Sequence, residues 1–261
     1  MSELEDLLRR GREALETGDF RAAITWLRQV TQGAPDDPGG WQLLGEALAE
    51  DGQLPDAIDA LNRARRLRPE DIELLYALGD THFENHDSDA ALQTYRAILD
   101  LDEGEADAWV SMGLVHFNRE QVEQAVSCYR KALDIEPDSV FALNSLGDAQ
   151  FSQGDEGAAL ATFRKILELD PEDAQAHFNL GEMYYDAGDL PAAEQECRAA
   201  LRCDPGHAFA CLTLGNIFLD QEQPREALHF FQEFLLRERS PAAKEIRDEV
   251  AAVVEGLKSE L

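Results

Sequence analysis

Aromatic and acidic side chains recur at fixed intervals along the middle of the chain. Four aromatic residues follow one another at a spacing of 34 residues: Phe83, Phe117, Phe151 and Tyr185. An acid stands three residues before three of these rings: Asp80, Asp148 and Glu182. Rings beside carboxylates suit an apolar peptide that carries Arg or Lys, through burial, cation–π contact and ion pairing. The pattern therefore favours binding chemistry.

Catalytic and metal chemistry have less support in the sequence. Phosphate-binding loops and dinucleotide-binding glycine motifs are absent, and no nucleophile, base and acid converge near His82, His116 or His177. The four cysteines form no C-x-x-C pair and lack paired histidines, so we expect buried thiols in a reducing compartment, with a zinc site as the alternative. We therefore expect no enzyme, no cofactor and no metal.

Two ladders of small residues define the elements that carry these side chains. Glycine recurs every 34 residues, at Gly11, Gly45, Gly79, Gly113, Gly147, Gly181 and Gly215. Alanine follows each glycine twelve residues later, at Ala23, Ala57, Ala91, Ala125, Ala159, Ala193 and Ala227. If the glycine is position 8, the sequence predicts seven units: 4–37, 38–71, 72–105, 106–139, 140–173, 174–207 and 208–241.

Each unit reads as a helical hairpin. Apolar residues at positions 4, 7, 8 and 11 share one helix face, and those at positions 20, 24 and 27 share a second. A breaker such as Gly154-Asp155 separates the two helices, and a proline at position 32 ends the second. A glycine inside a helix costs about 1 kcal/mol relative to alanine. We therefore expect each ladder glycine to permit a close approach of the two helices, with the ladder alanine as the small partner.

The ladder resembles the tetratricopeptide repeat family, whose signature is W-x2-L-G-x2-Y…A-x3-F…P, over about residues 4–241. The resemblance implies an all-α fold, an α-solenoid of seven hairpins in a right-handed superhelix. It also implies that positions 2, 5, 9, 12 and 13 of the first helices line a concave groove. The candidate peptide-binding residues on these positions are Tyr76, Asp80, Phe83, Phe117, Asn118, Asn144, Asp148, Phe151, Phe178, Glu182, Tyr185 and Asn216. The alternative is that the position-12 rings fill gaps between hairpins and that the acids are a solvated face.

The C-terminal residues predict one more helix after the last unit. Ser240-Pro241 reads as an N-cap and first helical residue, so the helix is expected over 241–261. Its apolar stripe comprises Ile246, Val250, Val253, Val254, Leu257 and Leu261. We expect this helix to cap the last repeat, because a solenoid must cover its ends; a dimerisation helix is the alternative. The 34-residue spacing continues without interruption, so the sequence predicts no domain boundary.

The net charge of −30 over 261 residues limits the possible partners. It argues against nucleic acid and against anionic membrane, both of which need a basic surface. No signal peptide or membrane-spanning run is visible, so we expect a cytoplasmic protein. The expected function is an adaptor that binds a protein or peptide segment with basic and apolar residues in its groove. The alternative is a scaffold that self-assembles through its terminal repeats, although a monomer is favoured.

Overall fold

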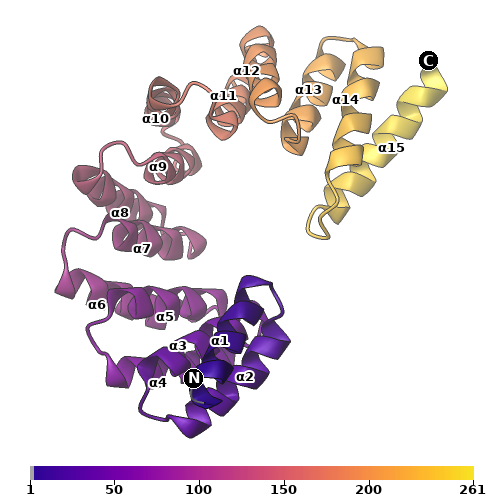
Figure 1. Ribbon diagram of the computed structural model, residues 1–261. Helices are drawn as coiled ribbons and strands as arrows, with labels where there is room; N and C mark the ends of the chain where they lie inside the picture. Colours follow the sequence, from indigo (N-terminus) through magenta and orange to yellow (C-terminus); the bar gives the residue numbers. More distant parts are fainter. Residues whose placement is uncertain (1–2) are drawn as a thin grey trace. The chain divides into compact units, whose positions relative to one another are not determined.

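The computed structural model describes residues 3–261 as an all-α protein, and this part of the chain contains fifteen helices and no strand (Figure 1). The helices are α1 Glu3–Glu16, α2 Phe20–Gly33, α3 Pro38–Glu50, α4 Leu54–Leu67, α5 Ile72–Glu84, α6 Ser88–Leu101, α7 Ala106–Asn118, α8 Val122–Ile135, α9 Val140–Ser152, α10 Glu156–Leu169, α11 Ala174–Asp186, α12 Leu190–Cys203, α13 Ala208–Asp220, α14 Pro224–Arg237 and α15 Lys244–Glu260. The all-α solenoid expected from the sequence is confirmed.

Consecutive helices pair as hairpins, from α1 with α2 to α13 with α14. The chain divides between Pro137 and Asp138 into two compact units. The N-terminal unit contains α1 to α8 and the C-terminal unit contains α9 to α15. Within each unit a hairpin also packs on the next, as α2 does on α3 and α12 on α13.

The turn inside each hairpin contains a left-handed residue, and in four of the seven hairpins the aspartate that follows this residue caps the second helix. Gly154 has φ +80°, and the next residue, Asp155, accepts a hydrogen bond from the Ala158 N–H at 3.1 Å to begin α10. Aspartate in this role stabilises a helix start by about 1 kcal/mol. Glu120 takes the same backbone conformation, with φ +59°, although it carries a side chain. His86 and Glu222 do likewise, so these turns keep the geometry of the glycine turns and carry strain.

The ladder glycines make room for the side chain at position 24 of the same hairpin. A Cβ placed on Gly147 would lie 2.5 Å from the Phe163 ring, and one on Gly181 would lie 2.5 Å from Cys197 Sγ. Close approach was expected, but with the ladder alanine as its partner. The ladder alanines are fully buried, and the larger residue one turn further along the second helix occupies the space over the glycine.

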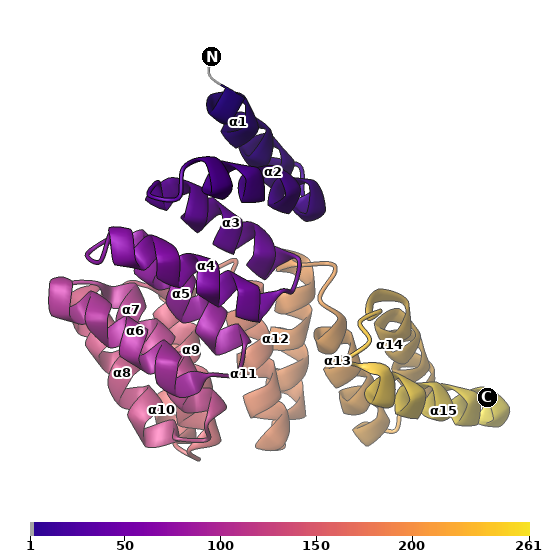
Figure 2. The ribbon, with the colours of Figure 1, turned by 90° about the horizontal axis from the view of Figure 1, so that it is seen from below.

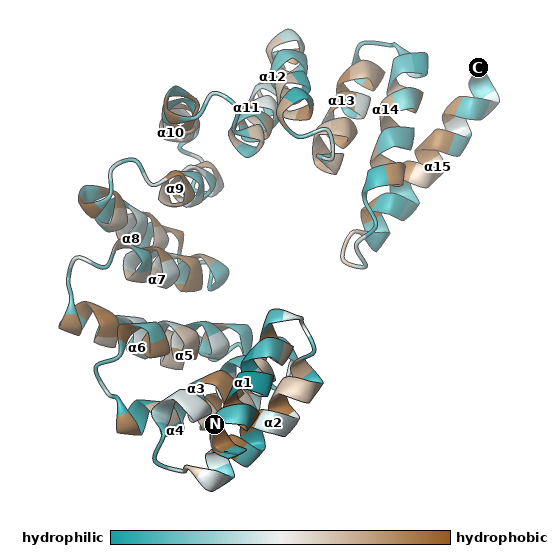
Figure 3. Ribbon diagram, viewed as in Figure 1, coloured by the Kyte–Doolittle hydropathy of each residue, from teal (hydrophilic) through white to brown (hydrophobic). Residues whose placement is uncertain are grey.

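Hydrophobic residues lie on the packed faces of the helices throughout both units (Figure 3). In the C-terminal unit the last helix, α15, packs against α14 and adds Val250, Val254 and Leu257 to the core (Figures 1 and 2). This helix begins at Lys244 and not at the expected Pro241, because Pro241 lies in a turn in which the Lys244 N–H donates to the Pro241 carbonyl at 3.3 Å. Among the described residues, no helix is long and apolar enough to cross a membrane.

Candidate functional site

An acidic pocket lies on the first helices of the N-terminal unit. It measures about 300 Å³ and is lined by Glu46 and Glu50 of α3 and by Asp80 and Glu84 of α5. No cationic side chain lines it. Desolvation by the surrounding protein raises the pKa of the Glu46 carboxyl and that of the Asp80 carboxyl. The acidic pocket therefore combines several uncompensated negative charges.

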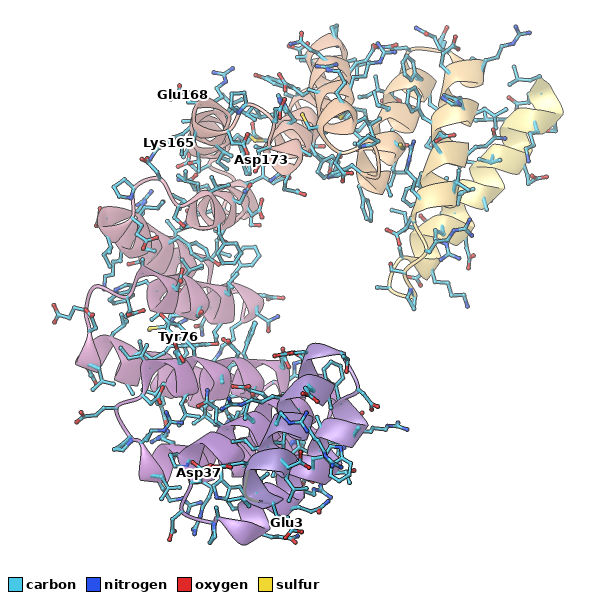
Figure 4. All side chains as sticks on the ribbon, in the orientation of Figure 1. Glu3, Asp37, Tyr76, Lys165, Glu168 and Asp173 are labelled. Atoms are coloured by element: carbon cyan, nitrogen blue, oxygen red, sulfur yellow. The ribbon has the colours of Figure 1, made fainter. Side chains whose placement is uncertain are left out.

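The aromatic candidates of α5 also hold the hairpins together. The Tyr76 hydroxyl donates to Glu105 Oε2 at 3.1 Å, which ties α5 to the residue before α7; Figure 4 labels Tyr76 on its helix. Tyr76 and Phe83 pack against the core of the unit. The Tyr95 hydroxyl donates to Asp80 Oδ1 at 2.6 Å. Tyr76 and Phe83 thus both contribute to packing, and Phe83 is one of the position-12 rings to which the alternative interpretation applies.

Two further candidates of this unit lie outside the acidic pocket. Phe117 is half-buried on α7, and Asn118 is exposed as the last residue of that helix. Neither contributes to the lining of the acidic pocket.

A second pocket, in the C-terminal unit, brings four of the candidates together. Asp148 and Phe151 of α9 and Phe178 and Glu182 of α11 line a cavity of about 120 Å³. The ring of Phe163, which is 1% exposed, also lines it, together with Asn179 and Met183. We call this cavity the phenylalanine pocket. Phe151 is 37% exposed, so the pocket has a ring at its rim as well as in its floor.

Hydrogen bonds hold the two carboxylates of the phenylalanine pocket in place. Asn179 Nδ2 donates to Asp148 Oδ1 at 3.2 Å, and the Thr213 hydroxyl of α13 donates to Glu182 Oε1 at 2.6 Å. Asp148 is exposed to solvent, and partial desolvation by its neighbours raises the pKa of its carboxyl. Desolvation also raises the pKa of Glu182, with a further rise from Asp186 that Thr213 opposes. Neither carboxylate forms an ion pair with a cationic side chain in residues 3–261.

The remaining candidates of the C-terminal unit do not line the phenylalanine pocket. The Tyr185 hydroxyl donates to Asp220 Oδ2 at 2.9 Å, which joins α11 to the end of α13, and burial raises the pKa of this phenol to about 12. Asn216 is half-buried on α13. The Asn144 Oδ1 atom of α9 is buried and accepts no hydrogen bond from the part of the chain that the structure describes.

Three pocket residues were not among the sequence candidates. Phe163 occupies position 24, which the ladder marks as core, yet its ring also reaches the pocket because Gly147 has no side chain to cover it. Asn179 and Met183 stand next to Phe178 and Glu182 in sequence. Their contribution follows from the way α11 packs, which the repeat register alone does not specify.

The chain belongs to the tetratricopeptide repeat family. A family model described as the tetratricopeptide repeat domain of cytochrome c-type biogenesis protein H matches residues 1–140. The general tetratricopeptide repeat model matches residues 110–173 and 144–208. Proteins of this family generally mediate protein–protein interactions, and the fold is typically a scaffold without enzymatic activity.

Similar proteins include one curated relative and two solved structures. Over 86 residues the chain is 31% identical to peroxisome biogenesis protein 5 of Arabidopsis thaliana, a match that covers 33% of this chain and only 12% of that protein. The crystal structure of MamA protein is 27% identical, with a TM-score of 0.58, over 66% of this chain and 94% of that one. A tetratricopeptide repeat protein from Parabacteroides merdae is 19% identical, with a TM-score of 0.75, over 97% and 98% of the two chains, and shows the same fold.

Proposed function

We propose that the chain is an adaptor that binds a peptide or protein segment carrying Arg or Lys beside apolar residues. The binding surface is the face formed by the first helices of the hairpins within each compact unit, and the phenylalanine pocket of the C-terminal unit anchors one cationic side chain. The observation that carries this proposal is the meeting of Asp148, Phe151, Phe178 and Glu182 around one small cavity.

The carboxylates favour a cationic ligand. Asp148 and Glu182 come from different helices, and both have a raised pKa because the protein desolvates them. A charge that is desolvated without an opposite charge is costly, and a ligand cation compensates it. A guanidinium or ammonium group between the two carboxylates therefore gains more than it would beside a fully hydrated acid.

The rings favour a cation that arrives on an apolar stem. Phe151, Phe163 and Phe178 line the pocket, and a cation that lies over the face of an aromatic ring gains about 0.5–2 kcal/mol, more when desolvated. A cavity of about 120 Å³ is close in size to the engineered cavity of about 150 Å³ that holds one benzene ring. The pocket thus suits the end of a single side chain, while neighbouring apolar residues of the ligand lie along α9 and α11.

The test compares fluorescein-labelled peptides that share one apolar sequence and carry a central Arg, Lys, Gln or Glu. Fluorescence anisotropy should show that the wild type prefers Arg and Lys. The double variant Asp148→Asn/Glu182→Gln should bind the Arg peptide at least about tenfold more weakly, because it removes both charges without changing side-chain shape.

A matched control is Glu249→Gln, which removes one charge from an exposed site on α15. This variant should bind like the wild type. A preference for the Glu peptide, or equal binding by the double variant and the wild type, would overturn the proposal.

A self-assembling scaffold is the second candidate function, and exposed apolar residues near the C-terminus favour it. Leu236 of α14 is 61% exposed, Val253 of α15 is 39% exposed and Leu261 is 52% exposed. Contact between such residues of two copies would bury them. Light scattering over a range of protein concentrations tests this function: growth of the mean mass with concentration supports it, and a constant monomer mass contradicts it.

A further inference from the structure

The second helix of the second hairpin carries an unusual concentration of positive charge. The whole chain has 23 Lys and Arg against 53 Asp and Glu, yet Arg63, Arg65, Arg66 and Arg68 fall within six residues at the end of α4. The helix dipole favours cations in the last turn and accounts for Arg65 and Arg66. It does not account for Arg28, which comes from α2 and lines the same pocket as Arg63 and Arg66.

This pocket, which we call the arginine pocket, lies between α2, α3 and α4 and measures about 650 Å³. Its apolar lining consists of Trp41, Leu44 and Leu48 of α3 and Ala60 of α4. Trp41 Nε1 donates to the Pro35 carbonyl at 2.8 Å, which fixes the orientation of the ring. Glu46 of the same helix lines the acidic pocket instead. The arginine pocket therefore lies on a different side of α3 from the acidic pocket, and it is not part of the surface proposed to bind a basic segment.

The cations of the arginine pocket are largely free to meet a ligand. Arg28 approaches Asp56 at 3.5 Å, a long and exposed ion pair. Arg63 and Arg66 are exposed, and neither forms an ion pair with an acidic side chain in residues 3–261. The lining contains three arginines and two aspartates, so the pocket carries a net positive charge in a chain of net charge −30.

A second tryptophan pocket of the same unit provides an internal comparison. It lies two repeats further along, measures about 780 Å³ and is lined by Trp109, which stands 68 residues after Trp41. There Lys131 Nζ lies 4.0 Å from the centroid of the Trp109 ring, so the protein supplies its own cation to that ring. No cation lies over Trp41 in the described part of the chain. The lining at Trp109 contains two cations against three acids, the reverse of the arginine pocket.

We propose that the arginine pocket is a second binding site, for an acidic peptide segment whose apolar side chain lies on Trp41 and whose carboxylates meet Arg28, Arg63 and Arg66. Arginine suits this role because its planar guanidinium group binds a carboxylate through two parallel hydrogen bonds. A long polyanion such as single-stranded nucleic acid fits less well, because Asp56 and Asp59 line the same pocket and the whole chain repels it. The chain would then join a basic segment at one site to an acidic segment at another.

The experiment uses short fluorescein-labelled peptides of Glu and Ser with one central Phe, with versions that replace Glu by Gln or Phe by Ser. Anisotropy should show binding of the Glu/Phe peptide and loss of binding when either feature is removed. The variant Arg63→Glu/Arg66→Glu should weaken binding at least about tenfold, because it reverses the charge that meets the ligand. The control Arg225→Glu changes an exposed arginine of α14, and together with the neutral variant Arg63→Gln/Arg66→Gln it separates local contact from net charge.

Intrinsic tryptophan fluorescence locates the site with unlabelled peptide. The change in emission should persist in Trp109→Phe and disappear in Trp41→Phe. Failure of every acidic peptide to bind, equal binding by the glutamate variant and the wild type, or tighter binding of a single-stranded oligonucleotide than of the peptides would overturn the proposal. The basic-peptide measurement on the phenylalanine pocket is independent of each of these results.

Discussion

At the scale of single residues, the ladder glycines allow the two helices of each hairpin to pack closely against each other. Each of them lies under a side chain of the partner helix, and no atom could be added there without moving that side chain. An interior glycine normally costs helix stability, so its presence in all seven hairpins reflects tertiary packing rather than local preference.

Substitution of Gly147 by alanine should therefore destabilise the protein although alanine is the better helix former. The new Cβ would lie 2.5 Å from the Phe163 ring, and such overpacking costs about 1–3 kcal/mol. Gly256→Ala on α15 is the matched control, because no atom lies within 4 Å of the added Cβ. Thermal melts should show a lower Tm for Gly147→Ala and an unchanged or higher Tm for Gly256→Ala. The same response from both variants would contradict this account of the ladder.

The charged carboxylates of the phenylalanine pocket should lower the stability of the folded protein at neutral pH, although they favour binding of a basic ligand. The pKa of Asp148 is raised above 3.8 and that of Glu182 above 4.5, so the folded protein holds these protons more tightly than the unfolded chain. The protonated carboxyls therefore stabilise the folded protein at low pH. This stabilisation is lost as the pH rises through the raised pKa values of the two groups. At neutral pH, Asp148→Asn should therefore raise the Tm while it weakens binding of the basic peptide.

Binding of the basic peptide by the wild type should weaken as the pH falls through the raised pKa values and the two carboxylates become neutral. Anisotropy titrations at a series of pH values, with Asp148→Asn/Glu182→Gln as the reference, measure this effect. A wild-type affinity that does not depend on pH, or a lower Tm for Asp148→Asn at neutral pH, would contradict the role given to these acids.

At the scale of elements, α15 completes the core of the C-terminal unit with one face only. Val254 is 4% exposed, whereas its neighbour Val253 is 39% exposed. Val254→Asp should lower the free energy of unfolding by at least about 2 kcal/mol, because it buries a charge without a partner. Val253→Asp makes the same chemical change on the open face and should cost much less. Denaturant unfolding of both variants measures the difference, and equal losses would mean that α15 is not docked as the structure shows.

The helices themselves could be predicted because two constraints coincide at each 34-residue step. Small residues such as Gly147 and Ala159 mark the packed positions, and a turn such as Gly154-Asp155 marks the change of helix. The start of α15 could not be predicted from Ser240-Pro241, because this pair of residues also fits a turn. The division after Pro137 has no local signal, since this proline occupies the same ladder position as the others.

The candidate site could be predicted only in part. The repeat register places Asp148 and Phe178 on the same face of the first helices of their units. It does not specify which of the side chains on that face meet around a cavity. Tyr185 occupies the same repeat position as Phe151. Its hydroxyl donates a hydrogen bond to Asp220, and its ring does not line the phenylalanine pocket. The difference arises from contacts between hairpins, which vary from one repeat to the next.

At the scale of the whole molecule, the net charge of −30 should govern how fast a basic ligand arrives. Long-range attraction accelerates association at low salt and is screened at a distance of about 10 Å in 0.1 M salt. The association rate constant of the Arg peptide should therefore fall at least about tenfold between roughly 0.05 M and 0.5 M salt. Stopped-flow anisotropy measures this rate, with the Gln peptide as control. A rate that salt does not change would show that charge does not guide the encounter.

The central claim is that a basic, apolar segment binds around the phenylalanine pocket. The most direct measurement is amide NMR of the whole chain titrated with the Arg peptide, since it locates the ligand without a substitution. We predict that the largest shift changes fall on α9 and α11, around Asp148, Phe178 and Glu182. Changes confined to α10, α12 or the N-terminal unit, or no changes at saturating peptide, would contradict the account.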